Sequence, residues 1–309
     1  MTGLQTKNAE RIPGCLKAAR QQKDMELSNR MKAVAELVPC GHTAADVGCD
    51  HGFVSIYLAQ HDICPRVFAG DVRKGPLDRA KEHIRESGLS DRITAVLSDG
   101  LKNIPVAGRE GQEEICGADG FIAAGMGGKL IVQILTDVPE KTGALKWCVL
   151  SPQSEIWLVR QKLTELGFLI LRENMVLEDG KYYPMMLAVR EAEAEWSSEA
   201  ADVRRKNDAL FERMSAAGFT EEERERAADW LGARLIDERN AVLISFLGHI
   251  MSTDELLLAG MPETAASGKE DGIAEAVLEA KQERIALRRR EIERRMELSG
   301  KVLGFLGEE

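Results

Sequence analysis

The chain has 309 residues, of which 44% are hydrophobic and 30% are charged, and its formal net charge is −10. These values are typical of a globular protein with one large domain and a smaller one. No apolar run approaches the roughly 18 residues that span a bilayer. The first 25 residues lack the continuous apolar stretch of a secretory signal. We therefore expect neither export nor a membrane partner.

Cysteine and charge usage narrow the class further. The six cysteines are scattered without a CxxC pair, which favours reduced thiols in a cytoplasmic protein and argues against a zinc site, so we expect no metal. Basic charge gathers near the two ends, since residues 1–32 and 281–295 each hold seven basic and three acidic residues. An isolated basic cluster is most often a solvated helix face, so this asymmetry alone identifies no partner.

Between residues 43 and 190, short apolar runs alternate with helix-like segments. The predicted strands are residues 43–49, 67–71, 93–97, 120–124 and 147–150, and the predicted helices between them are 53–60, 76–87, 129–136 and 155–166. Two more runs, 168–176 and 182–189, flank a Glu-Asp-Gly turn and predict an antiparallel hairpin. The pattern predicts an α/β fold with a doubly wound, largely parallel sheet closed by that hairpin.

Strand signals end near residue 190, and charged residues at helical spacing follow. Residues 227–251 carry one broad apolar stripe, residues 253–272 have the composition of a linker, and residues 273–298 repeat apolar side chains every seven positions. Two such helices joined by a loop predict an antiparallel coiled-coil hairpin. We therefore expect an N-terminal extension over residues 1–25, an α/β domain over 26–190 and a helical coiled-coil domain over 191–309.

The most informative segment follows the first predicted strand. Gly48 permits a tight turn and the close approach of a ligand to the backbone. The N–H groups that follow, which suit a carboxylate at the start of a helix, belong to Cys49, Asp50 and His51. Asp46 can accept a hydrogen bond from an amino group of the same ligand, although it can equally cap the helix. An adjacent carboxylate and amino group form the methionyl end of S-adenosylmethionine.

Two more acids follow at the ends of the next two predicted strands. Asp71, before Val72, lies where an acid accepts both hydroxyls of a ribose. Asp99, before Gly100, lies where a carboxylate can receive the adenine amino group. Because parallel strands end at one edge of a sheet, the three acids together predict an S-adenosylmethionine site. NAD is disfavoured, since an aspartate replaces the second glycine of its fingerprint and would repel a pyrophosphate.

Seven short stretches match one enzyme family. They are Leu27-Ser28-Asn29-Arg30-Met31, Asp46-Val47-Gly48-Cys49-Asp50-His51, Ala69-Gly70-Asp71, Gly75-Pro76-Leu77, Ser98-Asp99-Gly100-Leu101, Ala124-Gly125-Met126-Gly127-Gly128 and Glu178-Asp179-Gly180-Lys181-Tyr182-Tyr183. In them the chain resembles the bacterial tRNA methyltransferases that modify N1 of the adenosine at position 22. The Asp-His pair and the Ala-Gly-Met-Gly-Gly loop are the most specific of these matches.

The resemblance implies a Rossmann-like class I methyltransferase domain over residues 26–190 and a cytoplasmic, S-adenosylmethionine-dependent tRNA (adenine-N1)-methyltransferase. It adds Arg30, Ala124 and Gly125 to the expected cofactor residues, with Arg30 alternatively reaching an RNA phosphate. The family's helical tail is a coiled-coil hairpin thought to assist tRNA binding. The basic residues on that tail here are Arg288, Arg289, Arg290, Arg294 and Arg295.

Residues 125–128 follow the fourth predicted strand, where many methyltransferases that act on amino groups have Asn or Asp. Here this position provides only backbone groups and the flexible Met126 side chain. This fits a target with an available lone pair, such as adenine N1, for which catalysis is mainly alignment. We expect the carbonyls of Ala124 and Gly125, and Asp50, to accept from the adenine N6 group. Tyr183 is expected to stack on the extruded base. The paired glycines after Met126 equally fit close packing of helix on strand.

Some features depart from the family or leave alternatives. The family usually has Gln-Pro-Asn after the fifth strand, where this chain has Ser151-Pro152-Gln153. His51 is a ligand or packs at the start of its helix. Open alternatives are a methyltransferase for another RNA position or a small molecule, and a non-catalytic RNA-binding module on the same fold.

Overall fold

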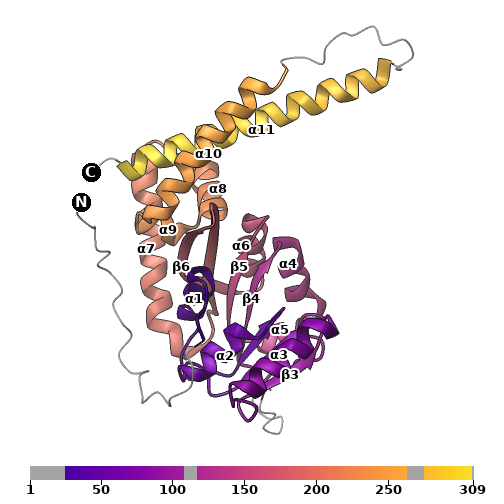
Figure 1. Ribbon diagram of the computed structural model, residues 1–309. Helices are drawn as coiled ribbons and strands as arrows, with labels where there is room; N and C mark the ends of the chain where they lie inside the picture. The colour runs from indigo at the N-terminus through magenta and orange to yellow at the C-terminus, as the bar shows by residue number, and fades with distance from the viewer. Residues whose placement is uncertain (1–24, 108–116, 263–274, 308–309) are drawn as a thin grey trace, which may run out of the picture.

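A computed structural model of the chain describes residues 25–107, 117–262 and 275–307. Seven strands within these ranges form one sheet in the order β3-β2-β1-β4-β5-β7-β6 (Figure 1). The strands are β1 (Ala44–Val47), β2 (Val67–Asp71), β3 (Ile93–Leu97), β4 (Gly120–Met126), β5 (Trp147–Pro152), β6 (Phe168–Glu178) and β7 (Lys181–Arg190). Strands β1 to β5 pair in parallel, and β7 is antiparallel to β5 and β6. The predicted doubly wound sheet with a closing hairpin is confirmed.

Helices cover both faces of this sheet (Figure 1). One face packs against α1 (Asn29–Glu36), α2 (Phe53–Gln60), α3 (Lys74–Glu86) and the start of α7 (Ser197–Ala216). The other packs against α4 (Gly128–Asp137) and α6 (Ile156–Glu165), with the short α5 (Pro139–Ala144) after α4. Because both faces are covered, the central strands are apolar on both sides, as the sequence pattern indicated.

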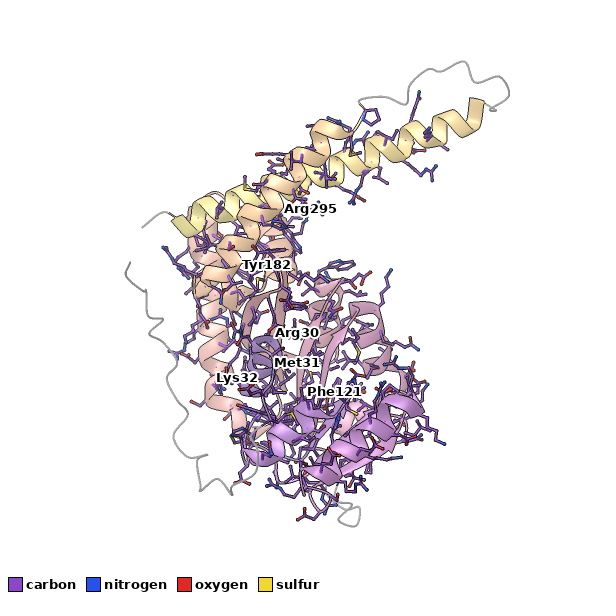
Figure 2. The ribbon with its side chains drawn as sticks, in the orientation of Figure 1. Arg30, Met31, Lys32, Phe121, Tyr182 and Arg295 are labelled. Atoms are coloured by element: carbon purple, nitrogen blue, oxygen red, sulfur yellow. The ribbon has the colours of Figure 1, made fainter. Side chains whose placement is uncertain are left out.

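The helix α1 is one that the sequence pattern did not indicate, because it has eight residues and is mostly polar. Its start is stabilised by Ser28, whose hydroxyl oxygen accepts the backbone N–H of Met31 at 3.4 Å. Burial of Ala33, Val34 and Ala35 holds it on the sheet. The consequence is positional, since α1 brings Arg30 to the carboxyl ends of the strands (Figure 2).

The tail is helical, as predicted. The apolar stripe over residues 227–251, which predicted a single helix, is divided among three helices. They are α8 (Glu221–Leu231), α9 (Ala233–Asp237) and α10 (Ala241–Gly260). Gly232, with φ of 101°, ends α8, and Arg239, with φ of 50°, precedes Asn240. The Asn240 side chain then caps α10 by accepting the N–H groups of Val242 and Leu243. The apolar stripe is continuous in sequence because all three helices bury one side in the same core.

The predicted linker over residues 253–272 is partly wrong, because α10 continues to Gly260, and residues 263–272 lie outside the described ranges. After them, α11 (Glu275–Gly307) runs back along α10 and forms a helical hairpin that projects from the molecule (Figure 1). Ile292 of the seven-residue repeat is buried. The helical hairpin is confirmed, while supercoiling of the pair stays a prediction. The predicted N-terminal extension lies outside the described residues except for Met25.

One helix among the described residues, α10, is long and apolar enough to cross a membrane by length and composition. The sequence pattern predicts no such segment, because its apolar stripe ends at residue 251. The helix α10 continues to Gly260 and so reaches the necessary length. A single helix of this kind is weak evidence for a membrane span. Asp254 on α10 is fully buried and ion-paired with Arg295 of α11, so the helix has a polar partner within the protein.

Buried charged hydrogen bonds join the tail to the α/β domain. Arg160 of α6 donates from Nε and Nη2 to Glu173 Oε1 of β6, at 3.0 and 2.7 Å. Its Nη1 donates to the carbonyl oxygens of Asp229 and Trp230 in α8, at 2.7 and 2.9 Å. Glu173 Oε2 accepts the backbone N–H of Arg234 in α9 at 3.1 Å. One buried carboxylate therefore connects a sheet strand, a covering helix and two tail helices.

The closing hairpin also contributes side chains to the apolar core of the tail. Met175 of β6 is buried in the same cluster as Leu235 of α9 and Val302 of α11. Tyr182 of β7 packs against this cluster, and its hydroxyl lies 2.9 Å from Ser245 Oγ of α10 (Figure 2). The proposed division of the chain at residue 190 therefore separates two parts that share a core.

Candidate functional site

A cavity of about 530 Å³ opens at the carboxyl ends of the central strands. All predicted cofactor residues line it: Arg30, Asp46, Gly48, Cys49, Asp50, His51, Asp71, Val72, Asp99, Gly100, Ala124 and Gly125. Met126 lines it as well. The parallel register brings them together, since Val47 pairs with Gly70 and Asp71 with Leu97. Asp46 and Asp99, which are 53 residues apart in sequence, therefore share one site.

The turn after β1 has left-handed backbone that only a few residue types adopt easily. Gly48 has φ of 76° and Asp50 has φ of 49°. The N–H groups of Gly48 and Cys49 both donate to the carbonyl oxygen of Gly70, at 2.8 and 2.9 Å. A Cβ at Gly48 would lie 3.0 Å from Met126 Cε, across the cavity floor. Glycine is required here by both conformation and space.

Asp46 is the most perturbed acid of the site. Its side chain is buried, and Ser55 Oγ donates to Asp46 Oδ2 at 2.6 Å. Burial raises the pKa of the Asp46 carboxyl to about 6, against the opposing effect of the Ser55 hydrogen bond. A carboxylate kept from water but facing a cavity is poised to pair with a cationic group. Burial also raises the pKa of the neighbouring Cys49 thiol, so that thiol stays neutral.

Asp71 is buried at the tip of β2 and is held by two backbone donors. Asp71 Oδ1 accepts the N–H of Arg73 at 2.7 Å, and Oδ2 accepts the N–H of Asp50 at 3.3 Å. These bonds fix the carboxylate at the edge of the cavity while leaving lone pairs for a further donor. The next residue, Val72, is 62% exposed, which leaves an apolar surface beside the carboxylate.

Asp99 differs from the other two acids because it is exposed and ion-paired. Lys102 Nζ lies 2.5 Å from Asp99 Oδ2 and 3.3 Å from Asp137 Oδ2. At the adjoining Gly100, φ is 57° and an added Cβ would lie 3.1 Å from Ile134 Cγ1. The backbone at the tip of β3 is therefore tightly placed, whereas the Asp99 side chain can exchange partners at little cost.

Tyr183, the predicted stacking residue, lies beside the cavity and packs against Arg30. Among the described residues that line the cavity, Tyr183 is absent. The Arg30 guanidinium lies over the Tyr183 ring, 4.5 Å from its centroid, and so covers one face. The Arg30 backbone N–H donates to Glu178 Oε1 at 3.2 Å, and Arg30 Nε lies 3.8 Å from Oε2. Tyr183 thus holds Arg30 in the cavity wall, and its stacking on a target base stays a prediction.

The loop after β4 is an irregularity in the sheet. The register with β5 shifts between Ala124 and Met126, and Gly125 there has φ of 79°. A Cβ at Gly125 would lie 3.8 Å from Arg30 Nη1 and 3.9 Å from Gln153 Nε2, so the position is open but flanked by donors. A Cβ at Gly128 would lie 2.5 Å from the carbonyl oxygen of Ser154. For Gly128 the packing interpretation is therefore correct.

His51 lines the cavity and also packs at the start of α2, so its packing is confirmed and its contact with a ligand stays a prediction. Its Nε2 lies 3.7 Å from Asp50 Oδ2. Its ring stacks on Phe53 at 5.5 Å, and Phe53 stacks on His83 at 4.9 Å. His83 Nδ1 donates to the His51 carbonyl oxygen at 3.0 Å. These contacts fix the turn between β1 and α2.

Several lining residues were not expected from the sequence. They are Met31, Phe53, Val54, Arg73, Leu130, Ile134 and Gln153. Gln153 follows β5, and its place after a strand tip was the one available signal. Phe53 and Leu130 are 37% and 45% exposed at the first turns of α2 and α4, where apolar side chains are usually buried. No group of three or more potential metal ligands occurs among the described residues.

The comparison with protein families decides the class. A family model described as a methyltransferase domain matches residues 27–186, just over half of the chain. The chain belongs to this methyltransferase family. The match spans the sheet through most of β7 and includes each of the acids at the strand tips. The methyltransferase class predicted from the strand tips is confirmed.

Relatives of the methyltransferase agree with this. The chain is 29% identical over 221 residues to the tRNA (adenine(22)-N(1))-methyltransferase of Bacillus subtilis, covering 72% of this chain and 79% of that relative. It is 30% identical over 171 residues to a putative tRNA methyltransferase of Mycoplasma pneumoniae, covering 55% of this chain and 74% of that relative.

Solved structures show that the likeness extends into the tail. The crystal structure of the B. subtilis m1A22 tRNA methyltransferase TrmK is 25% identical, with a TM-score of 0.64 over 90% of this chain and 99% of that chain. A putative tRNA (m1A22) methyltransferase of Streptococcus pneumoniae, solved with S-adenosyl-L-methionine, is 20% identical and has a TM-score of 0.64 over 90% of this chain and 100% of that chain. The methyltransferase therefore shares its whole fold, helical tail included, with these proteins.

Proposed function

We propose that this methyltransferase transfers a methyl group from S-adenosylmethionine to N1 of the adenosine at position 22 of tRNA. The observation that carries the proposal is the meeting of Asp46, Asp71 and Asp99 in one cavity beside a glycine-rich bulge that offers acceptors but no side-chain base. The similarity to the B. subtilis enzyme, whose name states this reaction, supports the same substrate.

The residues of the cavity fit S-adenosylmethionine, which supplies an electrophilic methyl group when bound. Asp46 is a buried carboxylate suited to the ligand's amino group, and the lack of a side chain at Gly48 lets the ligand's carboxylate approach the turn after β1. Asp71 has lone pairs for two ribose hydroxyls, and Val72 and Leu130 offer apolar surface to the adenine ring. Asp99 would exchange Lys102 for the adenine amino group.

In the proposed reaction the protein aligns the target base and excludes water from it. The two N–H groups at N6 of the target adenine donate to two of three candidate acceptors, the carbonyls of Ala124 and Gly125 and the Asp50 carboxylate, which leaves the N1 lone pair directed at the methyl group. Met126 forms an apolar wall of the site. Gln153 takes the place of the family's Asn, and Arg30, held by Tyr183, contributes a positive charge at the rim.

The proposal is tested by incubating the protein and S-adenosylmethionine with an unmodified tRNA transcript that has adenosine at position 22. Nucleoside digestion and mass spectrometry should show 1-methyladenosine. A transcript with guanosine at position 22 is the matched control and should stay unmodified. Methylation elsewhere in the RNA would favour another RNA position, and cofactor binding without methylation of either transcript would favour a small-molecule substrate or a non-catalytic role.

Cofactor affinity is expected to fall at acid pH because of Asp46. Its pKa is about 6 in the free protein, and a cation beside it favours the ionised form, so affinity rises with pH through this value and is constant above it. Calorimetry should show binding about fourfold weaker at about pH 5.5 than at about pH 7.5. The Asp46→Asn variant should bind weakly at both pH values with no such change. An equal pH dependence in that variant would assign the effect to another group.

We also propose that α11 contacts the tRNA backbone, with a smaller set of arginines than the sequence indicated. Arg295 is ion-paired with buried Asp254, and Arg289 donates to the carbonyl oxygens of Leu258 and Met261. Arg288, Arg290 and Arg294 are exposed and remain suited to phosphates, since the one ion pair that they form within the described residues, Arg288 with Glu291, is exposed and easily exchanged. The same proposal assigns the α/β domain to residues 26–190, the helical domain to residues 191–309 and the protein to the cytoplasm, where its substrate is modified.

A further inference from the structure

A second cavity lies where the α/β domain meets the helical tail. It has a volume of about 350 Å³ and lies between α6, α8 and α11. The residues that matter for its chemistry are Trp157, Gln161, Arg226, Trp230 and Arg295. We refer to this cavity as the junction groove. It shares no lining residue with the cofactor cavity.

Trp157 gives the junction groove an aromatic surface that the fold does not use. Its side chain is 45% exposed, and among the described residues it has no aromatic, cation–π or hydrogen-bond partner. By contrast, Trp230 on the opposite wall is half-buried and packs edge-on against Phe246, with ring centroids 6.2 Å apart. A large exposed indole in a groove is a stacking surface for a planar ligand.

The same groove has positive charge without a counter-ion. Arg226 of α8 is exposed and, within the described parts of the chain, forms no hydrogen bond or ion pair. A smaller adjoining cavity of about 300 Å³ shares Arg226 with the junction groove and adds Arg294 of α11, which is likewise exposed and unpaired among the described residues. Two free guanidinium groups from different helices therefore flank one opening.

Four acids line the two cavities, Asp229 in the junction groove and Glu222, Glu223 and Glu297 in the smaller one. Asp229 Oδ2 accepts from Gln161 Nε2 at 2.6 Å, and Glu223 is ion-paired with Lys301 at 2.6 Å. Glu222 and Glu297 also line the smaller cavity and are exposed.

The junction groove lies close to the proposed reaction site along the chain. Gln153 lines the cofactor cavity and Trp157 lines the groove, four residues later in sequence. Even a fully extended chain spans at most roughly 14 Å over four residues. Nucleotides next to a target base in the cofactor cavity would therefore be within reach of Trp157.

We propose that the junction groove binds one unpaired nucleotide of the RNA substrate close to the target adenosine, with its base stacked on Trp157 and its phosphate between Arg226 and Arg294. The proposal rests on the function proposed above and adds a substrate subsite outside the cofactor cavity. RNA fits better than a peptide, because the groove combines an exposed aromatic face with unpaired arginines, the pairing that single-stranded nucleic acid requires.

The test compares variants of the full-length protein in tRNA binding and in methylation. Trp157→Leu keeps apolar bulk but removes the aromatic face, and should weaken tRNA binding about tenfold. Trp157→Phe should restore most of that loss. Arg226→Gln should weaken tRNA binding and reduce the slope of log affinity against log salt by about 1, whereas Trp157→Leu should leave this slope unchanged. Arg205→Ala, which removes an exposed arginine of α7 paired with Asp202, is the matched control and should bind normally.

Cofactor affinity, measured by calorimetry, should be the same in all four variants. If the unaltered protein methylates tRNA and Trp157→Leu and Arg226→Gln bind it normally, the junction groove is not an RNA subsite and only this inference fails. If Trp157→Phe is as defective as Trp157→Leu, stacking is overturned. If the unaltered protein neither binds nor methylates tRNA, the proposed function itself fails.

Discussion

Replacing Glu173 by alanine is expected to lower the free energy of unfolding by about 3–5 kcal/mol. The Glu173 and Arg160 side chains are 1% and 5% exposed, so the variant would leave a guanidinium buried without its counter-ion. It would also remove the acceptor of the Arg234 backbone N–H, which holds α9 against the sheet. Chemical denaturation, followed by circular dichroism, measures the loss.

The Arg172–Glu199 ion pair provides the matched control. It also joins β6 to the tail, through α7, but its side chains are 42% and 38% exposed. Arg172→Ala should therefore cost less than about 1 kcal/mol. Similar losses in the two variants would show that burial of the Glu173 carboxylate is not what makes it important.

Replacing Asp71 by asparagine is expected to weaken S-adenosylmethionine binding about 100-fold, since two hydrogen bonds to a charged acceptor are altered. The side-chain amide of the variant can still accept a hydrogen bond from one ribose hydroxyl, but it presents its NH2 group, which cannot accept, to the second hydroxyl. Asparagine preserves the size of the side chain and an oxygen to accept the Arg73 N–H, so the variant should remain folded. Calorimetry of the purified variant, with its thermal unfolding as a check on folding, provides the measurement.

Asp99→Asn is the comparison for this experiment. The Asp99 carboxylate is exposed and already paired with Lys102, so its replacement should weaken cofactor binding less than about tenfold. If both variants bound equally well, the buried acid at the tip of β2 would not be the ribose ligand. The proposed orientation of the cofactor would then be wrong.

Most of the cofactor cavity could be predicted because its residues sit at strand tips. Apolar runs located the strands, and parallel strands end at one edge, so Asp46, Asp71 and Asp99 could be brought together without coordinates. The contact between the Tyr183 ring and Arg30 could not be predicted in this way, since it depends on α1, a helix too short to leave a periodic pattern.

The tail was harder to predict, for a physical reason. Its apolar residues at helical spacing gave the correct secondary structure, but three helices that bury one side in a common core produce the same pattern as one long helix. The break at Gly232 also has a tertiary cause, because an added Cβ there would lie 2.5 Å from the Glu173 carboxylate oxygens. Contacts of this kind, like the pairing of Arg295 with Asp254, link positions too far apart in sequence to be read locally.

The core that the closing hairpin shares with the tail limits how this enzyme can be taken apart. In a fragment ending at residue 190, Met175 and Tyr182 would lose the apolar side chains that they pack against. The buried Arg160 would lose the α8 carbonyl oxygens that accept its hydrogen bonds. The helical arm is thus not a detachable accessory that could be exchanged between enzymes without loss. The tail is fixed to the sheet by this shared core. The distance between the free end of the α10–α11 hairpin and the cofactor cavity is therefore set when the chain folds.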